Sequence, residues 1–209
     1  MVQRLYEEMK ESPSQTAGPY VHIGTNPNWV EIAGVWKEDL GLAIIGPQTK
    51  GERIVIEGQV FDGSGEPVRD ALIEIWQADA EGLYPSPKET RGTADPAFLG
   101  WARQPVSDTV GAYRFETIRP GSVPYPDGRE QAPHITVWIV ARGINIGLHT
   151  RLYFGDERQA NAADPLLARV QSAERRQTLI APKTMRDGLP VFTFDIRLQG
   201  DGETVFLDM

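Results

Sequence analysis

The sequence predicts a mainly β protein: an antiparallel β-sandwich core with an irregular N-terminal arm, long loops and short helices. Several short segments alternate apolar and polar residues with the period of two that a strand requires. Sixteen prolines and twenty-one glycines are scattered without a repeat over 209 residues, which is typical of many turns rather than of disorder. Helical periodicity is confined to one late insertion, and this order of elements favours an antiparallel sandwich.

The chain is predicted to divide into an N-terminal arm with a connecting segment, residues 1–50, and one β-sandwich domain, residues 51–209. Residues 2–9 are compatible with one or two helical turns, which prolines and glycines then interrupt. The following segment, SPSQTAGPYVHIG at 12–24, either lies on a partner surface or tethers the arm to its own chain. No element is assigned to residues 26–50, because their apolar residues show no clear period.

Five predicted strands form the centre of the sandwich because each alternates or is rich in β-branched and aromatic residues. They are residues 53–62, 70–79, 112–118, 134–141 and 148–154.

Between these strands, residues 81–103 form a long irregular excursion, and loops of this length are usually functional or interface-forming. Residues 157–180 are expected to form a short helix that stops before Pro165 and a second helix with Leu166, Leu167 and Val170 on one face. The segments VFTFDIRLQ at 191–199 and ETVFLD at 203–208 are predicted to be strands.

Composition limits the partners and the compartment. The formal net charge is -8 and no segment is dense in lysine and arginine, so neither a nucleic acid nor an anionic membrane surface is expected as a partner. No stretch approaches the roughly 20 apolar residues of a membrane span. The chain has no cysteine, and its first residues, MVQRLYEEMKESPS, lack the apolar stretch of a secretory signal, so a cytoplasmic location is expected.

Common enzyme signatures are absent from the sequence: there is no G-x-S-x-G motif, P-loop, Rossmann glycine fingerprint or cysteine nucleophile. The triplet His134-Ile135-Thr136 is one residue short of H-x-H, the spacing that places two imidazoles on one face of a strand. Thr136 occupies the place of the second ligand. A strand histidine is more often a hydrogen-bonded core or rim residue than a metal ligand, and the pattern leaves both roles open.

Long segments resemble the intradiol ring-cleavage dioxygenases, and the resemblance covers nearly the whole chain. They are GQVFDGSGEPVRDALIEIWQADAEGLY, DPAFLGWARQPVSDTVGAYRFETIRPG, APHITVWIVARGINIGLHTRLYF and FDIRLQGDGETVFLD. Within that family, PSQTAGPYVHIG and ARGINIGLHTRLYF are most similar to the α subunits of its heteromeric members. The resemblance implies a mixed β-sandwich assembled as αβ units in a higher-order oligomer.

The resemblance also implies a non-haem ferric ion, Fe(3+), held in the catalytic subunits by two tyrosines and two histidines. Tyr125 matches the second tyrosine and His134 the first histidine, whereas Thr136 replaces the second histidine and Gln131 replaces a nearby arginine. Residues 85–94, where the first tyrosine is expected, contain none. Two donors do not make a ferric site, so this chain is expected to have no metal and no catalytic residue, and the iron is expected in a β subunit.

By the same resemblance, the α subunit contributes part of the wall of its partner's substrate pocket. The matching residues are Thr16, Gly18, Pro19 and Arg142. The guanidinium of Arg142 can meet a benzoate carboxylate with two parallel hydrogen bonds, although a structural ion pair is the open alternative.

The function implied is that of an iron-free α subunit. It supports the O2-dependent cleavage of 3,4-dihydroxybenzoate (protocatechuate) to 3-carboxy-cis,cis-muconate at the β subunit's ferric site, in aromatic (β-ketoadipate) catabolism. One alternative is a transthyretin-like sandwich that carries a small molecule or mediates adhesion, and the full-length resemblance weighs against it. Another is a self-sufficient metalloenzyme that uses His22, His134 and His149, against which the missing ligands weigh.

Overall fold

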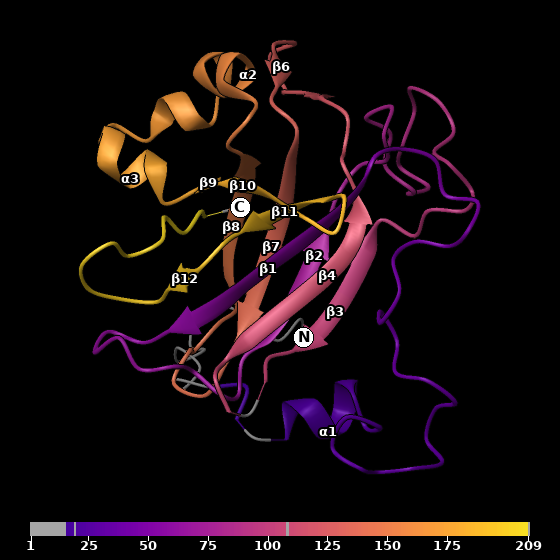
Figure 1. Ribbon diagram of the computed structural model, residues 1–209, viewed down its shortest axis with the longest axis vertical. Helices are drawn as coiled ribbons and strands as arrows, with labels where there is room; N and C mark the ends of the chain where they lie inside the picture. The colour runs from indigo at the N-terminus through magenta and orange to yellow at the C-terminus, as the bar shows by residue number, and fades with distance from the viewer. Residues whose placement is uncertain (1–15, 19, 108, 209) are drawn as a thin grey trace, which may run out of the picture.

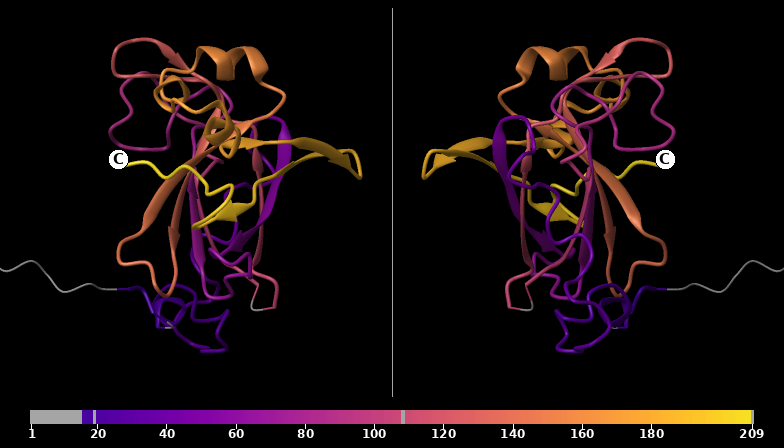
Figure 2. Two further views of the ribbon diagram at one scale, coloured as in Figure 1. Left: turned by 90° about the vertical axis from the view of Figure 1, so that its left-hand side faces the viewer. Right: turned by 90° about the vertical axis from the view of Figure 1, so that its right-hand side faces the viewer.

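The computed structural model describes residues 16–18, 20–107 and 109–208. Within these ranges the strands form two five-stranded sheets and a two-stranded ribbon. The two sheets lie against each other, as Figures 1 and 2 show, and the main apolar core contains side chains from both. The prediction of a mainly β sandwich is therefore confirmed.

The first sheet is built around β1, Arg53–Phe61. β4, Ala112–Ile118, pairs with β1 in antiparallel orientation along seven residues. β11, Leu189–Thr193, and β12, Ile196–Arg197, pair with β1 in parallel orientation. β10, Lys183–Arg186, is antiparallel to β11 and forms with it a hairpin that projects from the body (Figure 2).

The second sheet has the order β3-β2-β7-β8-β9. Its strands are β3, Trp101–Pro105; β2, Leu72–Trp76; β7, His134–Val140; β8, Leu148–Phe154; and β9, Ile180–Ala181. All neighbours are antiparallel except β8 and β9, which are parallel. The sandwich is thus mixed rather than purely antiparallel, as the family resemblance implied. Parallel partners are joined by long connections, and local sequence does not reveal such pairings.

Alternation along the strands produces the core because successive side chains point to opposite faces. Ile54 and Ile56 of β1 and Ile73 and Ile75 of β2 are buried in the same apolar cluster. Burial of each such side chain stabilises the fold by roughly 1.5–3 kcal/mol.

A buried polar pair also joins the sheets. Thr117 donates its hydroxyl hydrogen to Gln77 Oε1 at 2.8 Å, and Gln77 Nε2 donates to the Ile118 carbonyl at 2.9 Å. Both side chains are buried, so these bonds satisfy polar groups that would otherwise be costly to bury.

The helices are short. They are α1, Val21–Thr25; α2, Arg158–Ala163; the 3-10 turn η1, Leu167–Arg169; and α3, Ala173–Gln177. No helix within the described ranges is long and apolar enough to cross a membrane. The last three lie together at one end of the sandwich, opposite α1 (Figure 1), and Leu167 joins a second apolar cluster there.

Several local predictions need correction. The second late helix was predicted too long: residues 166–170 make only a 3-10 turn, and α3 follows separately. Residues 203–208 do not form a strand, although Thr204 and Leu207 each donate a backbone hydrogen bond to a neighbouring segment. Helix α1 was not predicted. The helical turns expected at 2–9 lie outside the described residues, and the division at residue 50 stays a prediction.

The two-stranded ribbon positions Tyr125 relative to β7. β5, Val123–Pro124, pairs with β6, Glu130–Gln131, immediately before β7 begins. Residues 125–129 form the turn between them, closed by a hydrogen bond from the Gly128 amide to the Tyr125 carbonyl at 2.8 Å. This turn fixes Tyr125 near the start of β7.

Candidate functional site

The residues singled out in the sequence fall into two groups at opposite ends of β7. Gln131, His134 and Thr136 lie at or just before its start, whereas Arg142 follows its last residue, Val140. A seven-residue strand spans roughly 20 Å at about 3.3 Å per residue. Figure 2 shows the β7–β8 turn at the end of the molecule where α1 lies, and α2 and α3 at the opposite end. One small aromatic molecule cannot touch both groups.

Thr16 holds the N-terminal segment to the β7–β8 turn. Its hydroxyl donates to the Ala141 carbonyl at 3.1 Å and accepts the Gly143 amide hydrogen at 2.9 Å. These two bonds fix the backbone on both sides of Arg142. The structure therefore brings Thr16 and Arg142 together, although they lie far apart in the sequence.

The Arg142 side chain is exposed and makes a single side-chain contact, through its Nε, within the described residues. Its Nε donates to Asp70 Oδ2 at 2.9 Å, while 68% of its side-chain surface is accessible. The structural ion pair that the sequence left open is present. Within the described residues neither terminal nitrogen of Arg142 has a protein partner. Those nitrogens remain available to bind a carboxylate.

Gly18 provides the bend that leads from Thr16 into α1. Its φ is +61°, a conformation that glycine adopts without the steric cost of a Cβ. Apart from Gly18 itself and its chain neighbours, no atom of the described residues lies within 4 Å of the position that a Cβ would occupy, so this backbone is open on that side. Pro19, the remaining residue predicted in this group, lies outside the described residues.

At the other end of β7, His134 is 4% exposed and packs against the ring of Tyr153, with 5.6 Å between ring centroids. Its Nδ1 lies 2.8 Å from the Ala132 carbonyl oxygen, so Nδ1 carries the hydrogen and Nε2 has a free lone pair. Nε2 is buried and has no hydrogen-bond partner among the residues that the structure describes. Burial, together with the positive charge of Arg151, lowers the pKa of His134 to about 4, so the imidazole is neutral near pH 7.

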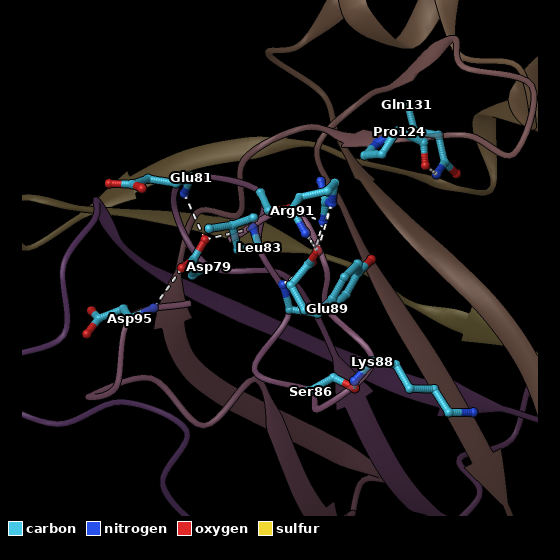
Figure 3. Close-up of polar contacts among 12 residues, drawn as sticks. Asp79, Glu81, Leu83, Ser86, Lys88, Glu89, Arg91, Asp95, Pro124 and Gln131 are labelled. Carbon is cyan, nitrogen blue, oxygen red and sulfur yellow. Dashed lines mark hydrogen bonds and ion pairs between the residues drawn. The ribbon is translucent and has the colours of Figure 1, made fainter. Parts of the chain in front are cut away.

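Gln131 belongs to a polar network with Arg151. Its Oε1 accepts a hydrogen bond from Arg151 Nη1 at 2.7 Å, and its Nε2 donates to the Pro124 carbonyl at 3.0 Å (Figure 3). The Tyr153 hydroxyl donates to Asp164 Oδ1 at 3.3 Å and lies 3.5 Å from Arg151 Nη1. Burial raises the pKa of Tyr153, so its phenol stays protonated. Sequence reasoning did not identify Arg151.

Tyr125 is half-buried on the turn between β5 and β6. The Arg129 guanidinium lies 5.8 Å from the centre of its ring, and Arg169 Nη1 lies 3.5 Å from its hydroxyl. Two cations therefore lie beside a phenol that the family resemblance assigns to the metal.

Thr136 faces the outer side of the second sheet. It is paired in register with Trp76 on β2 and with Arg151 on β8. It lines an open cavity of about 530 Å³ together with aromatic and charged residues of the same face. These are Glu74, Trp76, Trp101, Arg103, Trp138 and His149, and the core residue Ile75 adds to the floor of the cavity. A threonine hydroxyl is a poor substitute for the imidazole that the resemblance expects here.

Tyr84 was missed by the sequence analysis. It directly precedes the interval 85–94 in which a tyrosine was expected, and its ring stacks on Trp76 with 5.7 Å between centroids. Because Trp76 pairs with Thr136, Tyr84 lies on the same face as the replaced histidine. Burial raises the pKa of Tyr84, and the charge of Arg151 opposes that rise. The segment Gly82-Leu83-Tyr84, just before the interval searched, was the sequence signal that could have identified this tyrosine.

Two carboxylates hold the loop that carries Tyr84 (Figure 3). Asp79, which is 3% exposed, accepts three amide hydrogens of the loop. The donors are Glu81, Leu83 and Asp95. Glu89 pairs with Arg91 at 2.5 Å and accepts the Tyr84 amide hydrogen at 3.1 Å, and the bond from Arg91 is the main reason that the pKa of Glu89 falls to about 2.

These residues do not fit a ferric ion. Fe(III) binds hard anionic oxygens and imidazoles, and its tyrosine ligands must lose their protons. His134 Nε2 is the one free imidazole nitrogen at this end of β7 among the described residues, Thr136 offers no imidazole, and burial keeps Tyr84 protonated. The guanidinium of Arg151 adds a positive charge to the same cluster.

The three histidines do not lie together. His22 is on α1, His134 begins β7, and His149 pairs in register with Trp138, four residues along β7 from His134. Among the residues that the structure describes, no three His, Cys, Asp or Glu side chains are placed to share a metal ion. The arrangement thus offers no support to a three-histidine metalloenzyme.

Comparison with known proteins agrees with this architecture. A family model described as dioxygenase matches residues 25–200. The protocatechuate 3,4-dioxygenase α chain of Pseudomonas putida is 45% identical over 204 residues, which cover 97% of this chain and 98% of that one. The β chain of Burkholderia cepacia is 35% identical over 161 residues, 74% of this chain and 67% of its own length.

Among solved structures, catechol 1,2-dioxygenase from Acinetobacter sp. ADP1, inhibited by bound mercury, superposes with a TM-score of 0.56. The two are 18% identical, and the match covers 90% of this chain and 72% of that one, so this likeness concerns the fold alone. Family membership is established by sequence, through the match to the family model and the relative that is similar over its full length. The chain belongs to the intradiol ring-cleavage dioxygenase family.

Proposed function

We propose that this chain is the α subunit of a protocatechuate 3,4-dioxygenase. In this role it has no iron of its own and completes the substrate pocket of a β subunit that holds Fe(3+). The assembly uses O2 to cleave 3,4-dihydroxybenzoate between its hydroxyl-bearing carbons and yields 3-carboxy-cis,cis-muconate. Similarity to the α chains of Pseudomonas putida and Burkholderia cepacia, at 45% and 41% identity, supports this proposal.

The observation that carries the proposal is the separation of Arg142 from His134 along β7. Arg142 can bind a carboxylate, yet the positions that resemble iron ligands lie roughly 20 Å away at the other end of the strand. A catechol ring bound by Arg142 therefore cannot reach them. Its hydroxyl groups must meet a metal ion from another chain, which is the arrangement expected of an α subunit.

Within that pocket, the residues of this chain bind and orient the substrate. Arg142 places the carboxylate through its terminal nitrogens, while Asp70 fixes its Nε and Thr16 fixes the backbone on either side. Charge-assisted hydrogen bonds of this kind contribute roughly 1.5–3 kcal/mol. The redox chemistry takes place at the partner's iron.

An exposed apolar segment supports a heteromer. Residues 29–42 expose six large apolar side chains. They are Trp29, Ile32, Val35, Trp36, Leu40 and Leu42, each at least 38% exposed. Concentrated exposed aliphatic and aromatic side chains mark interaction surfaces. Figure 1 shows this part of the chain (indigo to violet) at the lower and right-hand edge of the molecule, in continuity with α1.

The assembly we propose is a higher-order oligomer of αβ units in the cytoplasm. The net charge of -8 and the absence of a dense basic segment favour neither nucleic acid nor membrane surfaces as partners. The substrate is a small anion, so the site needs a local cation rather than a basic surface.

The test is co-expression of this chain with a β subunit from the same genome. We expect the two to co-purify, with iron equal to the number of β chains and O2 uptake that depends on protocatechuate. A β subunit that is fully active without this chain would refute the proposal. So would stoichiometric iron and turnover in this chain alone.

A further inference from the structure

Arg151 lies directly across the sheet from Thr136. β7 and β8 are antiparallel, and these two residues are partners in the register. Side chains of directly opposed residues lie on the same face, with Cα atoms about 4.5–5.5 Å apart. The position at which the family resemblance implies a second histidine therefore faces an arginine.

The Arg151 guanidinium is connected to a carboxylate through one phenol, because the Tyr153 hydroxyl lies 3.5 Å from Nη1 and donates to Asp164. Nη1 donates to the neutral amide oxygen of Gln131, and Nε is buried without a hydrogen-bond partner in the described ranges. Within the described part of the chain, no carboxylate lies at ion-pair distance from Arg151. Partial burial of a cation without a counter-ion is costly, so a purely structural role explains this residue poorly.

Its charge acts on the groups that a metal ion would use. Within the described residues, the lone pair of His134 Nε2 is buried and has no partner. Arg151 Nη1 lies 3.5 Å from the Tyr153 hydroxyl, and the Tyr153 ring packs against His134 with 5.6 Å between ring centroids. The guanidinium therefore lies in the same cluster as His134, where its charge repels a second cation.

We propose that Arg151 excludes metal ions from this chain by placing a fixed positive charge beside His134 and Thr136. The threonine removes one ligand, and the arginine separately makes the remaining cluster repel a cation. The resemblance implies an arginine at position 131, where this chain has Gln131. Gln131 accepts a hydrogen bond from Arg151, so β8 supplies a positive charge to the same cluster. This inference goes beyond the proposed function because it concerns only this chain's own residues and stands whether or not a partner supplies iron.

The test compares iron retention by the full chain and three variants: Thr136→His, Arg151→Gln, and the two combined. Each protein is incubated with Fe(II) without air, oxidised and desalted, and its iron content and visible spectrum are measured. We expect the wild type and both single variants to retain little iron. The double variant should retain about tenfold more than Thr136→His and show tyrosinate-to-iron absorption, because it regains a ligand and loses the repulsive charge.

Two controls separate charge from shape and folding. Thr136→His with Arg151→Lys keeps the charge and should stay poor in iron, whereas Arg151→Met replaces Arg151→Gln if the latter does not unfold cooperatively. Thr136→His with Arg114→Gln removes an exposed arginine of β4, already paired with Glu116, and should behave like Thr136→His alone. The inference is wrong if Thr136→His alone binds as much iron as the double variant, or if neither neutral replacement of Arg151 increases retention.

Discussion

The Thr16 hydroxyl oxygen lies 3.1 Å from the carbonyl oxygen of Ala141, to which it donates a hydrogen bond. The same oxygen accepts the Gly143 amide hydrogen at 2.9 Å. A residue of the N-terminal segment thus fixes the backbone before and after Arg142. The position of this arginine depends on that contact as well as on its own strand, and the contact connects the arm to the proposed substrate pocket.

Arg142→Ala should lower kcat/KM for protocatechuate by about tenfold to a hundredfold, because a charge-assisted bond contributes roughly 1.5–3 kcal/mol. Catechol, which has no carboxylate, should be affected little. The measurement is made on the intact αβ assembly with matched iron content. Arg129→Ala, at the other end of β7, is the control and should leave kcat/KM unchanged for both substrates. An equal loss of kcat/KM for both substrates would indicate that Arg142 has a structural role.

Thr16→Val should lower kcat/KM for protocatechuate by roughly threefold to tenfold, since two hydrogen bonds worth about 0.5–1.5 kcal/mol each are lost at a partly exposed site. Thr16→Ser keeps the hydroxyl and should retain nearly full activity. Iron content and assembly should be unchanged in both variants. If valine and serine have the same effect, the hydroxyl does not position Arg142.

The chain purified alone should bind iron poorly and lack the visible band of iron-bound tyrosinate. Thr136 offers no imidazole, and burial disfavours the ionised phenol of Tyr84. Chemical iron analysis and a visible spectrum after loading test this, and Thr136→His by itself should not produce dioxygenase turnover. Stoichiometric iron with the band in the unmodified chain would contradict the account of this site.

The stability of the chain should fall as the pH decreases from about 7 to about 5. The pKa of His134 is lowered to about 4 by burial and by Arg151, so below about 6.5 the unfolded chain binds a proton that the folded chain does not. The loss reaches about 2 kcal/mol by pH 5 at roughly 1.4 kcal/mol per pH unit of complete linkage. This loss of stability disappears when the pH rises above the pKa of His134 in the unfolded chain.

Urea unfolding at several pH values in this range measures that slope. His134→Gln should flatten it, because the variant has no imidazole at this buried position. The assignment to His134 fails if the glutamine variant keeps the wild-type slope.

Trp36→Glu should weaken association with the β subunit by about tenfold or more, because aromatic residues at interfaces often contribute 2 kcal/mol or more. Trp36 is 46% exposed within the apolar segment 29–42, so the change should not unfold the chain. Met185→Glu on the β10–β11 hairpin, where Met185 is 62% exposed, is the matched control. Equilibrium binding or co-purification measures both. Loss of binding by Met185→Glu alone would assign the interface to the hairpin instead.

The isolated wild-type chain should self-associate for the same reason. Light scattering at micromolar concentration measures its mass. A stable monomer would count against an obligate heteromer.

The sequence by itself determined the central strands and the chemistry of the positions, but it missed β3, which begins within the segment 81–103 predicted to be irregular. Alternation over residues 53–62, 112–118 and 148–154 predicted β1, β4 and β8, because side-chain direction in a strand depends only on neighbouring residues. The triplet at 134–136, set beside the motif of the resembled family, was enough to predict that a ligand is missing. These features are encoded locally, so no knowledge of distant contacts was needed.

Only the tertiary structure decided which distant residues meet. The parallel pairing of β11 with β1, the contact of Thr16 with Ala141, and the position of Arg151 opposite Thr136 all join segments separated by long stretches of chain. Such contacts form because packing of the whole core fixes strand order and register, which no local period encodes. The same packing separates His134 from Arg142 by the length of β7, and under the proposed function it leaves Arg142 to a site that a partner chain completes.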